Sequence, residues 1–441
     1  MSPKHAHFNG SVNLADTELV MREIVARVPD GLRRIPDGET GERAGWIFFQ
    51  AHQFLRLPWL VPVRPFDPAE GDYEHMPQLR LAGGADPATV DWPAPGYADA
   101  YLRSYETFTK LRAEGTIPAG VRFQVEYPTP LASIGAYIVP EDRQALLPAY
   151  ERAMFADVGR LLSVIPPGEV AVQWDVAVEF SLLEEFFGPL WPGAYDALIA
   201  SLARCVDAVP AAVPAGLHLC YGDWGHQHFQ EPQSLAMQVR VLDAVAAAAG
   251  RALSFVSFTV PQYQRAESYF APLTGLAAGP GTELNFGLVP YHPADQEPGT
   301  TSDQARLIDA ALAASPGGAR DWGVCTECGM GRAAREDVPV LLDLHREILA
   351  VGLSAQCQRR CFMADLTRRA NQHAWQLAEL AVIETAITEP GHRARLAVAR
   401  RDPGRRTDHP VRRRPSGSVP QQKERRAVSA ISIRAFWSRM G

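Results

Sequence analysis

The stretch Gly216-Leu-His-Leu-Cys-Tyr-Gly-Asp-Trp224 has the form of a short buried strand that ends in a turn of Gly, Asp and Trp. Side chains alternate across a strand, so His218 and Cys220 point to the same face. An imidazole and a thiol on one face can bind one metal ion, and Zn²⁺ accepts both ligand types. On its own, however, a His-x-Cys pair is more often a packed core cysteine beside a hydrogen-bonded histidine.

A second stretch, far downstream, favours the metal site. Trp322-Gly-Val-Cys-Thr-Glu-Cys-Gly-Met-Gly-Arg332 again runs from an apolar strand into a Gly-rich turn, and it supplies Cys328. We predict that His218, Cys220 and Cys328 together bind Zn²⁺. Cys325 would face the opposite side of the strand, and we interpret it as a core residue.

Short apolar strands alternate with segments of helical periodicity along most of the chain. The strand-like segments are residues 6–11, 32–35, 121–125, 170–174, 216–220, 252–259, 284–289 and 322–324. Strands separated by helices pair in parallel, and eight such units can close into a (β/α)8 TIM barrel. An open doubly wound sheet is the alternative, but no Gly-x-Gly-x-x-Gly follows the first strand. We therefore predict an α/β fold, a single TIM barrel, with a long insertion after the second strand at about 58–96.

Composition divides the chain into two parts. Residues 1–388 are expected to form the barrel as one domain, and residues 389–441 a disordered basic tail. Between 391 and 441 there are fourteen Lys and Arg against three Asp and Glu, with no apolar period. A tail of this kind could touch nucleic acid or an acidic surface, but we favour one without a function of its own.

The whole chain has 441 residues, 46% of them hydrophobic, and a net charge of −7, which gives no sign of specific nucleic-acid binding. It contains no apolar run of about 18 residues, so we expect no membrane span. It has six cysteines and no hydrophobic leader, a combination typical of a reducing compartment. We therefore expect a cytoplasmic protein.

Polar and reactive residues follow the strands at their C-terminal ends. They are Ser11, Asp37, Glu39, residues 127–130, Asp175, His218, Cys220, His292 and Cys328. The active sites of TIM barrels form at this end of the strands. Because seven of the eight strands supply such a residue, we predict an active site there.

In this order, the motifs resemble those of the catalytic, C-terminal barrel of cobalamin-independent methionine synthase, in the superfamily that includes uroporphyrinogen decarboxylase. The resemblance covers residues 6 to about 350, with His218-Leu-Cys220-Tyr as its best match. The other motifs are Gly10-Ser11, Gly38-Glu39 with Arg43, Pro128-Thr-Pro130, Gln173-Trp-Asp175, Tyr291-His292-Pro293, and Cys328-Gly329 with Arg332.

The resemblance implies a methyltransferase, in which zinc activates a small thiol such as homocysteine. In the family, the backbone of the Gly-Ser turn binds the substrate carboxylate, which points to Gly10 and Ser11 here. Carboxylates bind the substrate amine, which points to Glu39 and Asp175.

His292 occupies the position of the family's acidic histidine, and it would protonate the leaving group as general acid. The expected partners are a small thiol and a methyl donor, folate or another.

Two departures from the family leave alternatives open. The family takes a fourth zinc ligand, a Glu, from the sixth strand, but residues 252–262 contain no acid, and Glu267 and Glu283 have the wrong spacing. Zinc would then keep a fourth position for water or substrate. The family's extra barrel, which helps to hold folate, has no counterpart. A decarboxylase or lyase, or a metal-free binding protein on the same barrel, is the alternative function.

Overall fold

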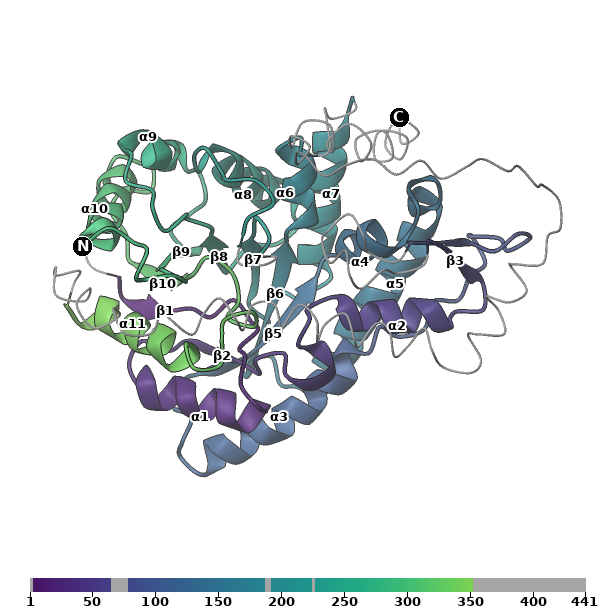
Figure 1. Cartoon of the computed structure of the whole chain (residues 1–441), viewed down its shortest axis with the longest axis horizontal. Coiled ribbons are helices and arrows are strands. Elements are labelled where there is room, and N and C mark those ends of the chain that lie inside the picture. The colour runs from purple at the N-terminus through teal and green to yellow at the C-terminus, as the bar shows by residue number, and fades with distance from the viewer. Residues whose placement is uncertain (1–2, 65–77, 187–191, 224–226, 352–441) are drawn as a thin grey trace, which may run out of the picture.

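Eight parallel strands form one curled sheet, in the order β1-β10-β9-β8-β7-β6-β5-β2 (Figure 1). They are β1 (His5–Ala6), β2 (Arg34–Pro36), β5 (Arg122–Pro128), β6 (Val170–Val176), β7 (Ala215–Leu219), β8 (Phe255–Phe258), β9 (Glu283–Val289) and β10 (Trp322–Thr326). The structure is a computed structural model that describes residues 3–64, 78–186, 192–223 and 227–351. A parallel bridge between Ala6 and Leu32 joins the two ends of the sheet. The prediction of a TIM-barrel-like α/β fold is therefore confirmed.

Strand β6 shows how the sequence suits a barrel wall. All seven of its residues are buried, as expected for a parallel strand covered on both faces. Trp174 points outward, where its ring contacts Phe155 of a surrounding helix. Gln173 and Asp175 alternate with it and point into the barrel, so β6 supplies polar side chains to the interior.

Hydrogen-bonded polar side chains fill the interior below the C-terminal end of the strands. His7 Nε2 lies 2.9 Å from Gln173 Oε1, across the barrel. Asn9 accepts a hydrogen bond of 2.8 Å from Ser257 Oγ and donates one of 2.8 Å to the carbonyl of Thr326. A buried network with these partners rigidifies the floor on which the upper residues rest.

Helices cover the outside of the sheet, as Figure 1 shows. They are α1 (Thr17–Arg27), α3 (Tyr97–Ala113), α5 (Pro140–Val164), α7 (Ala194–Asp207), α8 (Ala236–Ala248), α10 (Thr300–Ala313) and α11 (Val338–Val351). Between β8 and β9, α9 (Glu267–Phe270) and the 3-10 turn η3 (Ala271–Gly275) take this place. Local sequence explains their starts: the Asp16 carboxylate accepts from Leu19 N at α1, and α5 begins at Pro140 with two acids in its first turn. Shorter helices, α4 (Pro130–Tyr137) and α6 (Val178–Leu183), follow β5 and β6 directly.

The insertion after β2 is more ordered than its sequence predicts. After the 3-10 turn η1 (Gly41–Arg43) and helix α2 (Phe48–Arg56), the expected irregular segment contains an antiparallel pair, β3 (Leu60–Arg64) and β4 (Gln78–Leu81). These strands are too short for a clear alternation of side chains, and prolines interrupt the pattern. Phe54 of α2 packs edge-on against Trp92, Tyr137 and Tyr150, which fixes the insertion to the barrel.

The predicted tail and the domain boundary at 388/389 lie outside the described residues. Across the described ranges, no helix combines the length and the apolar character needed to cross a membrane.

Candidate metal centre

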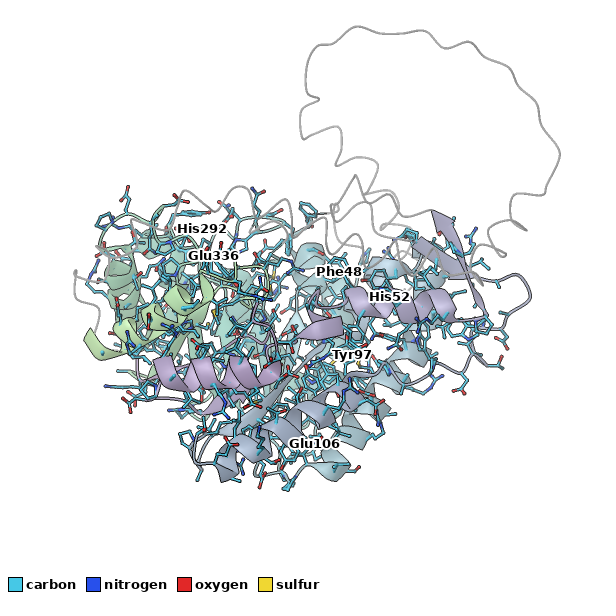
Figure 2. The ribbon with its side chains drawn as sticks, turned by 60° about the horizontal axis from the view of Figure 1, so that its bottom comes forward. Phe48, His52, Tyr97, Glu106, His292 and Glu336 are labelled. Carbon is cyan, nitrogen blue, oxygen red and sulfur yellow. The ribbon has the colours of Figure 1, made fainter. Side chains whose placement is uncertain are left out.

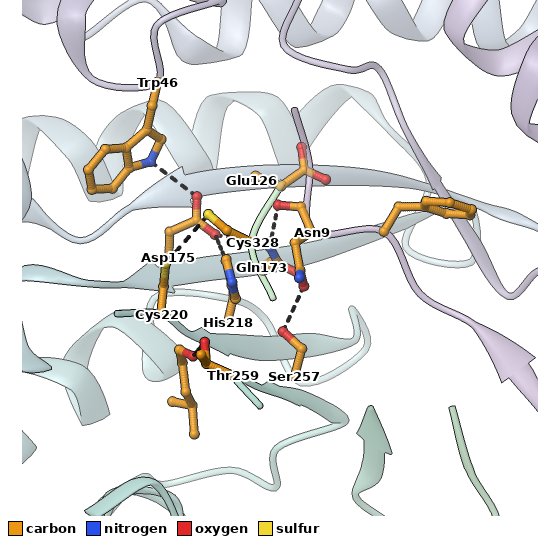
Figure 3. Close-up of polar contacts among 12 residues, drawn as sticks. Asn9, Trp46, Glu126, Gln173, Asp175, His218, Cys220, Ser257, Thr259 and Cys328 are labelled. Atoms are coloured by element: carbon orange, nitrogen blue, oxygen red, sulfur yellow. Dashed lines mark hydrogen bonds and ion pairs between the residues drawn. The ribbon is translucent and has the colours of Figure 1, made fainter. Parts of the chain in front are cut away.

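Three side chains of metal-ligand type meet at the C-terminal end of the barrel. His218 lies near the end of β7, Cys220 follows that strand, and Cys328 follows β10. One donor atom from each lies within 4.8 Å of the other two, and the two sulfur atoms are 3.5 Å apart (Figure 3). No second group of this kind exists among the described residues. Cys325 is buried in β10 and is not part of the group.

The turn after β10 explains how Cys328 reaches the other two. Gly329 packs directly on Ser11, so that a Cβ at this position would lie 2.3 Å from Ser11 Oγ and 3.0 Å from Ser11 N. Met330 N then donates a hydrogen bond of 2.6 Å to the Ser11 carbonyl. Only glycine allows this close stacking, which places the turn, and Cys328 with it, over the end of β1.

Both ring nitrogens of His218 have partners. Nδ1 lies 3.3 Å from Asp175 Oδ1, and Nε2 lies 3.4 Å from the carbonyl oxygen of Glu327. Burial by itself lowers the pKa of His218, but the contact with Asp175 and the neighbouring Cys328 outweigh burial, and the pKa lies above its usual value. A carboxylate on one ring nitrogen is the arrangement that orients a metal-binding histidine.

Asp175 connects the centre to the barrel floor and to the insertion. Its Oδ1 also accepts a hydrogen bond of 2.9 Å from Gln173, and its Oδ2 accepts one of 3.2 Å from the indole of Trp46 (Figure 3). The parallel register places Asp175 of β6 directly opposite His218 of β7. Both carboxylate oxygens are thus engaged.

The two thiols are close enough for a metal, with Cys220 buried and Cys328 partly exposed. Cys220 is buried, and its sulfur accepts a hydrogen bond of 3.3 Å from Gly222 N. The hydrogen bond from Cys220 and then burial raise the pKa of the Cys328 thiol well above its usual value. Tetrahedral zinc, with Zn–S of about 2.3 Å and Zn–N of about 2.0 Å, needs its donors roughly 3.5 to 3.8 Å apart. The donor set and its spacing therefore fit Zn²⁺ with three protein ligands.

Acidic residues lie close together at the mouth of the barrel, the C-terminal end of its strands, next to the metal centre. Asp37 pairs with Arg43, accepts from Ser104 Oγ at 2.6 Å and accepts from the Glu39 amide at 2.9 Å. Burial, and then the charge of Asp175, raise the pKa of Glu39 to about 8. Glu39 also has a positive φ of 51°, an unusual conformation for a residue with a side chain. Glu39 is therefore held as a neutral acid near neutral pH.

Gly10 and Ser11 lie at the mouth beside these acids. Gly10 has a φ of 117°, and a Cβ there would lie 2.8 Å from Glu126 Cγ. Glycine is required at this position, because Glu126 occupies the space a side chain would need.

His292 follows β9 and is half-buried. Its backbone is clamped by Gln262, which accepts from His292 N at 3.0 Å and donates to His292 O at 3.3 Å. In Figure 2, His292 lies on the opposite side of the view from Phe48 and His52 of α2. Burial raises the pKa of Asp223 to about 6, against the opposing charges of Arg332, His228 and His292, so His292 and Asp223 share one neighbourhood.

Among the described residues, no acid joins His218, Cys220 and Cys328 in place of the missing fourth ligand. Thr259 follows β8, and its hydroxyl lies 2.8 Å from the carbonyl of Leu219 and 3.2 Å from that of Glu327. Glu267 is exposed at the start of α9, and Glu283 lies at the opposite end of the barrel. Neither of these two acids joins the His218, Cys220 and Cys328 group.

Sequence reasoning missed three residues next to the centre. Glu327 directly precedes Cys328, a position that could have drawn attention to it. His228 lies in the loop after Cys220, and its side chain is only 11% exposed and contacts Glu327. Trp46 reaches Asp175 from the insertion, and no local pattern signals such a long-range contact.

Comparison with known proteins yields little. No protein-family model matches the sequence, and no curated protein matches it. Among solved structures, a candidate vitamin-B12-independent methionine synthase from Listeria monocytogenes is similar in fold, with 12% identity and a TM-score of 0.46. The alignment covers 79% of this chain and 98% of that chain. A likeness at this level assigns no activity to the protein.

Proposed function

We propose that the protein is a zinc-dependent methyltransferase, or alkyltransferase, whose acceptor is a small thiol such as homocysteine. The convergence of His218, Cys220 and Cys328 at the C-terminal end of the barrel carries this proposal. One imidazole and two thiolates form a ligand set that suits Zn²⁺, and a three-ligand site leaves a fourth position for substrate.

Zn²⁺ bound there would hold the substrate sulfur as a thiolate at neutral pH, where a free thiol with a pKa of ~8.5 is mostly protonated. Asp175 would keep the His218 ring in its metal-binding orientation through the Nδ1 contact. The resemblance to methionine synthase named above adds to this proposal, because that family uses a His, a Cys and a Cys in the same order, with a Glu as its fourth ligand.

The remaining residues would bind the acceptor. We assign the substrate ammonium to Glu39 and Asp175, since a cation between them offsets their mutual repulsion and favours ionised Glu39. We assign the substrate carboxylate to the backbone of Gly10 and Ser11. His292 would donate a proton to the leaving group of the methyl donor, which is a folate or another small molecule.

The first test is the zinc content of the purified protein, prepared without chelator, together with Cys220→Ser and Cys328→Ser. We expect about one zinc per chain in the parent and loss of zinc in both variants. Cys205→Ser is the matched control, because Cys205 is a buried cysteine of α7 outside the cluster, and it should keep the metal.

A zinc-loaded parent is then incubated with homocysteine and candidate methyl donors, and S-methylation is followed by mass spectrometry. A parent that holds no zinc, or variants that retain it, would rule out the proposed centre.

A further inference from the structure

Glu327, which precedes Cys328, contacts residues of β7 and of the segments that follow β7 and β8. Its carbonyl oxygen lies 3.4 Å from His218 Nε2 and 3.2 Å from Thr259 Oγ1. Its carboxylate accepts a hydrogen bond of 2.9 Å from Gln262 N, in the loop after β8, and pairs with His228 Nε2 at 2.9 Å. Because Glu327 is bonded to Cys328 in the chain, the contacts of its carboxylate with Gln262 and His228 fix the approach of Cys328.

His228 is held in turn from its other side. Its Nδ1 lies 3.2 Å from Glu231 Oε2, which also accepts a hydrogen bond of 2.7 Å from Tyr263. Burial by itself lowers the pKa of His228, but the hydrogen bonds to Glu231 and Glu327 more than offset burial and raise it to about 10. The histidine is therefore an imidazolium at neutral pH, unable to act as a base, and its role is that of a buried cation.

The positions of the two residues in the chain give this ion pair its significance. His228 belongs to the segment that follows Cys220, and Glu327 belongs to the segment that precedes Cys328. The two cysteines are 108 residues apart in the chain and follow β7 and β10, which are not neighbours in the sheet. The pair thus ties the two thiol-bearing segments together by their side chains, where no sheet hydrogen bond does so.

We propose that Glu327 and His228 are positioning residues of the metal centre, which hold Cys328 at the distance from Cys220 and His218 that a tetrahedral metal requires. The inference rests on the proposed zinc site and adds the device that preorganises it. Substitution of residues that contact metal ligands commonly weakens metal affinity by about 10- to 100-fold, because these residues fix the orientation of the ligands.

The test measures metal binding in Glu327→Gln and His228→Gln, both close in size to the native residues. Zinc affinity is determined by competition with a chromogenic chelator, and the geometry is read from the visible absorption bands of the Co²⁺-substituted protein. We expect a 10- to 100-fold weaker affinity in each variant and a shift in the Co²⁺ bands. The double variant should bind no more weakly than the singles, because one interaction is removed in all three.

Glu231→Gln is the matched control. It also removes a carboxylate partner of His228, but on the side of the ring away from Cys328. We expect its affinity to stay within threefold of the parent and its Co²⁺ spectrum to be unchanged. Equal effects of Glu231→Gln and Glu327→Gln would overturn the positioning role, as would parent-like affinity and spectrum in Glu327→Gln.

The outcomes separate the two proposals. Zinc binding in the parent with no effect of Glu327→Gln removes the positioning role and leaves the proposed function intact. A parent that binds neither zinc nor Co²⁺ removes the proposed function, and the positioning role falls with it.

Discussion

The two ends of the barrel treat buried carboxylates in opposite ways. At the N-terminal end, the Glu283 side chain is 8% exposed and is surrounded by basic residues: His5 Nε2 lies at 3.0 Å, Arg33 Nη1 at 2.7 Å, and Arg34 in contact. Burial would raise the pKa of Glu283, but Arg34 and His5 lower it below its usual range.

At the C-terminal end, Asp37 and Glu327 are paired with Arg43 and His228, but Glu39 and Glu126 are compensated far less. Burial and neighbouring acids raise the pKa of Glu126 well above its usual value and that of Glu39 to about 8. Arg43 and Arg332 oppose the raised pKa of Glu39 only in part, and Arg43 is already paired with Asp37. At the N-terminal end, basic side chains of the protein balance the charge of Glu283, which stabilises the barrel. At the C-terminal end, Glu39 and Glu126 lack full balance, and there we propose that a cationic substrate group binds.

Breaking the balanced end should have the largest effect. Glu283→Gln leaves Arg34 without its buried partner, and we expect the free energy of unfolding at pH 7 to fall by about 3 to 5 kcal/mol. Because the pKa of Glu283 is depressed in the folded protein, its stabilisation is present above ~4.3, the unfolded-state value, and fades as the pH falls below it. The difference between variant and parent, measured by urea unfolding, should therefore shrink toward pH 3.

Glu18→Gln is the control for that experiment, because Glu18 forms an exposed ion pair with Arg22. It should produce no resolvable change. Equal stability of Glu283→Gln and the parent at pH 7 would contradict the balanced network.

Removing an acid at the C-terminal end should instead raise the free energy of unfolding. In Glu39→Gln the amide keeps the shape and the positive φ but cannot ionise. A raised folded-state pKa means that the parent loses stability as the pH rises from ~4.3 toward 8, and the variant lacks this loss. At pH 6, about 1.7 units above the unfolded-state value, we expect the variant to be more stable than the parent by about 2 kcal/mol, while its KM for the thiol acceptor rises. Parallel stability curves for the two proteins would contradict the raised pKa.

Asp175→Asn tests the link between the mouth and the metal. The amide weakens the contact that orients His218, so zinc affinity should fall by about 10-fold, at the lower end of the range for residues behind metal ligands. Chelator competition measures this fall. An unchanged affinity would show that the barrel wall alone orients the histidine.

Trp46→Phe should have the smallest effect. It removes one hydrogen bond to Asp175 and keeps an aromatic ring, so stability should change by less than about 1 kcal/mol and zinc affinity should not change. The KM for the acceptor should rise severalfold, because Asp175 loses a fixed partner. Trp59→Phe, at an indole that packs against Trp92 in the insertion, is the control and should leave KM as it is.

The barrel was predictable because its signals are local. Each strand is a short run of apolar residues, and each helix has its own period and caps, as at Asp16 and Pro140. The insertion was predicted less well, because β3 and β4 are only five and four residues long. Their pairing depends on contacts with α2 and with the aromatic cluster around Phe54 rather than on their own pattern.

The sequence by itself determined that eight strand-helix units follow one another and that His218 and Cys220 share one face. Both follow from residues that recur every two to four positions, because the backbone of a strand or helix places such residues on one face. Only the tertiary structure decided that Cys328 lies 3.5 Å from Cys220, that Glu327 pairs with His228, and that Glu39 keeps its proton. These properties depend on the closure of the ring, on the stacking of Gly329 upon Ser11 and on the removal of water, and each joins residues that are distant in the chain.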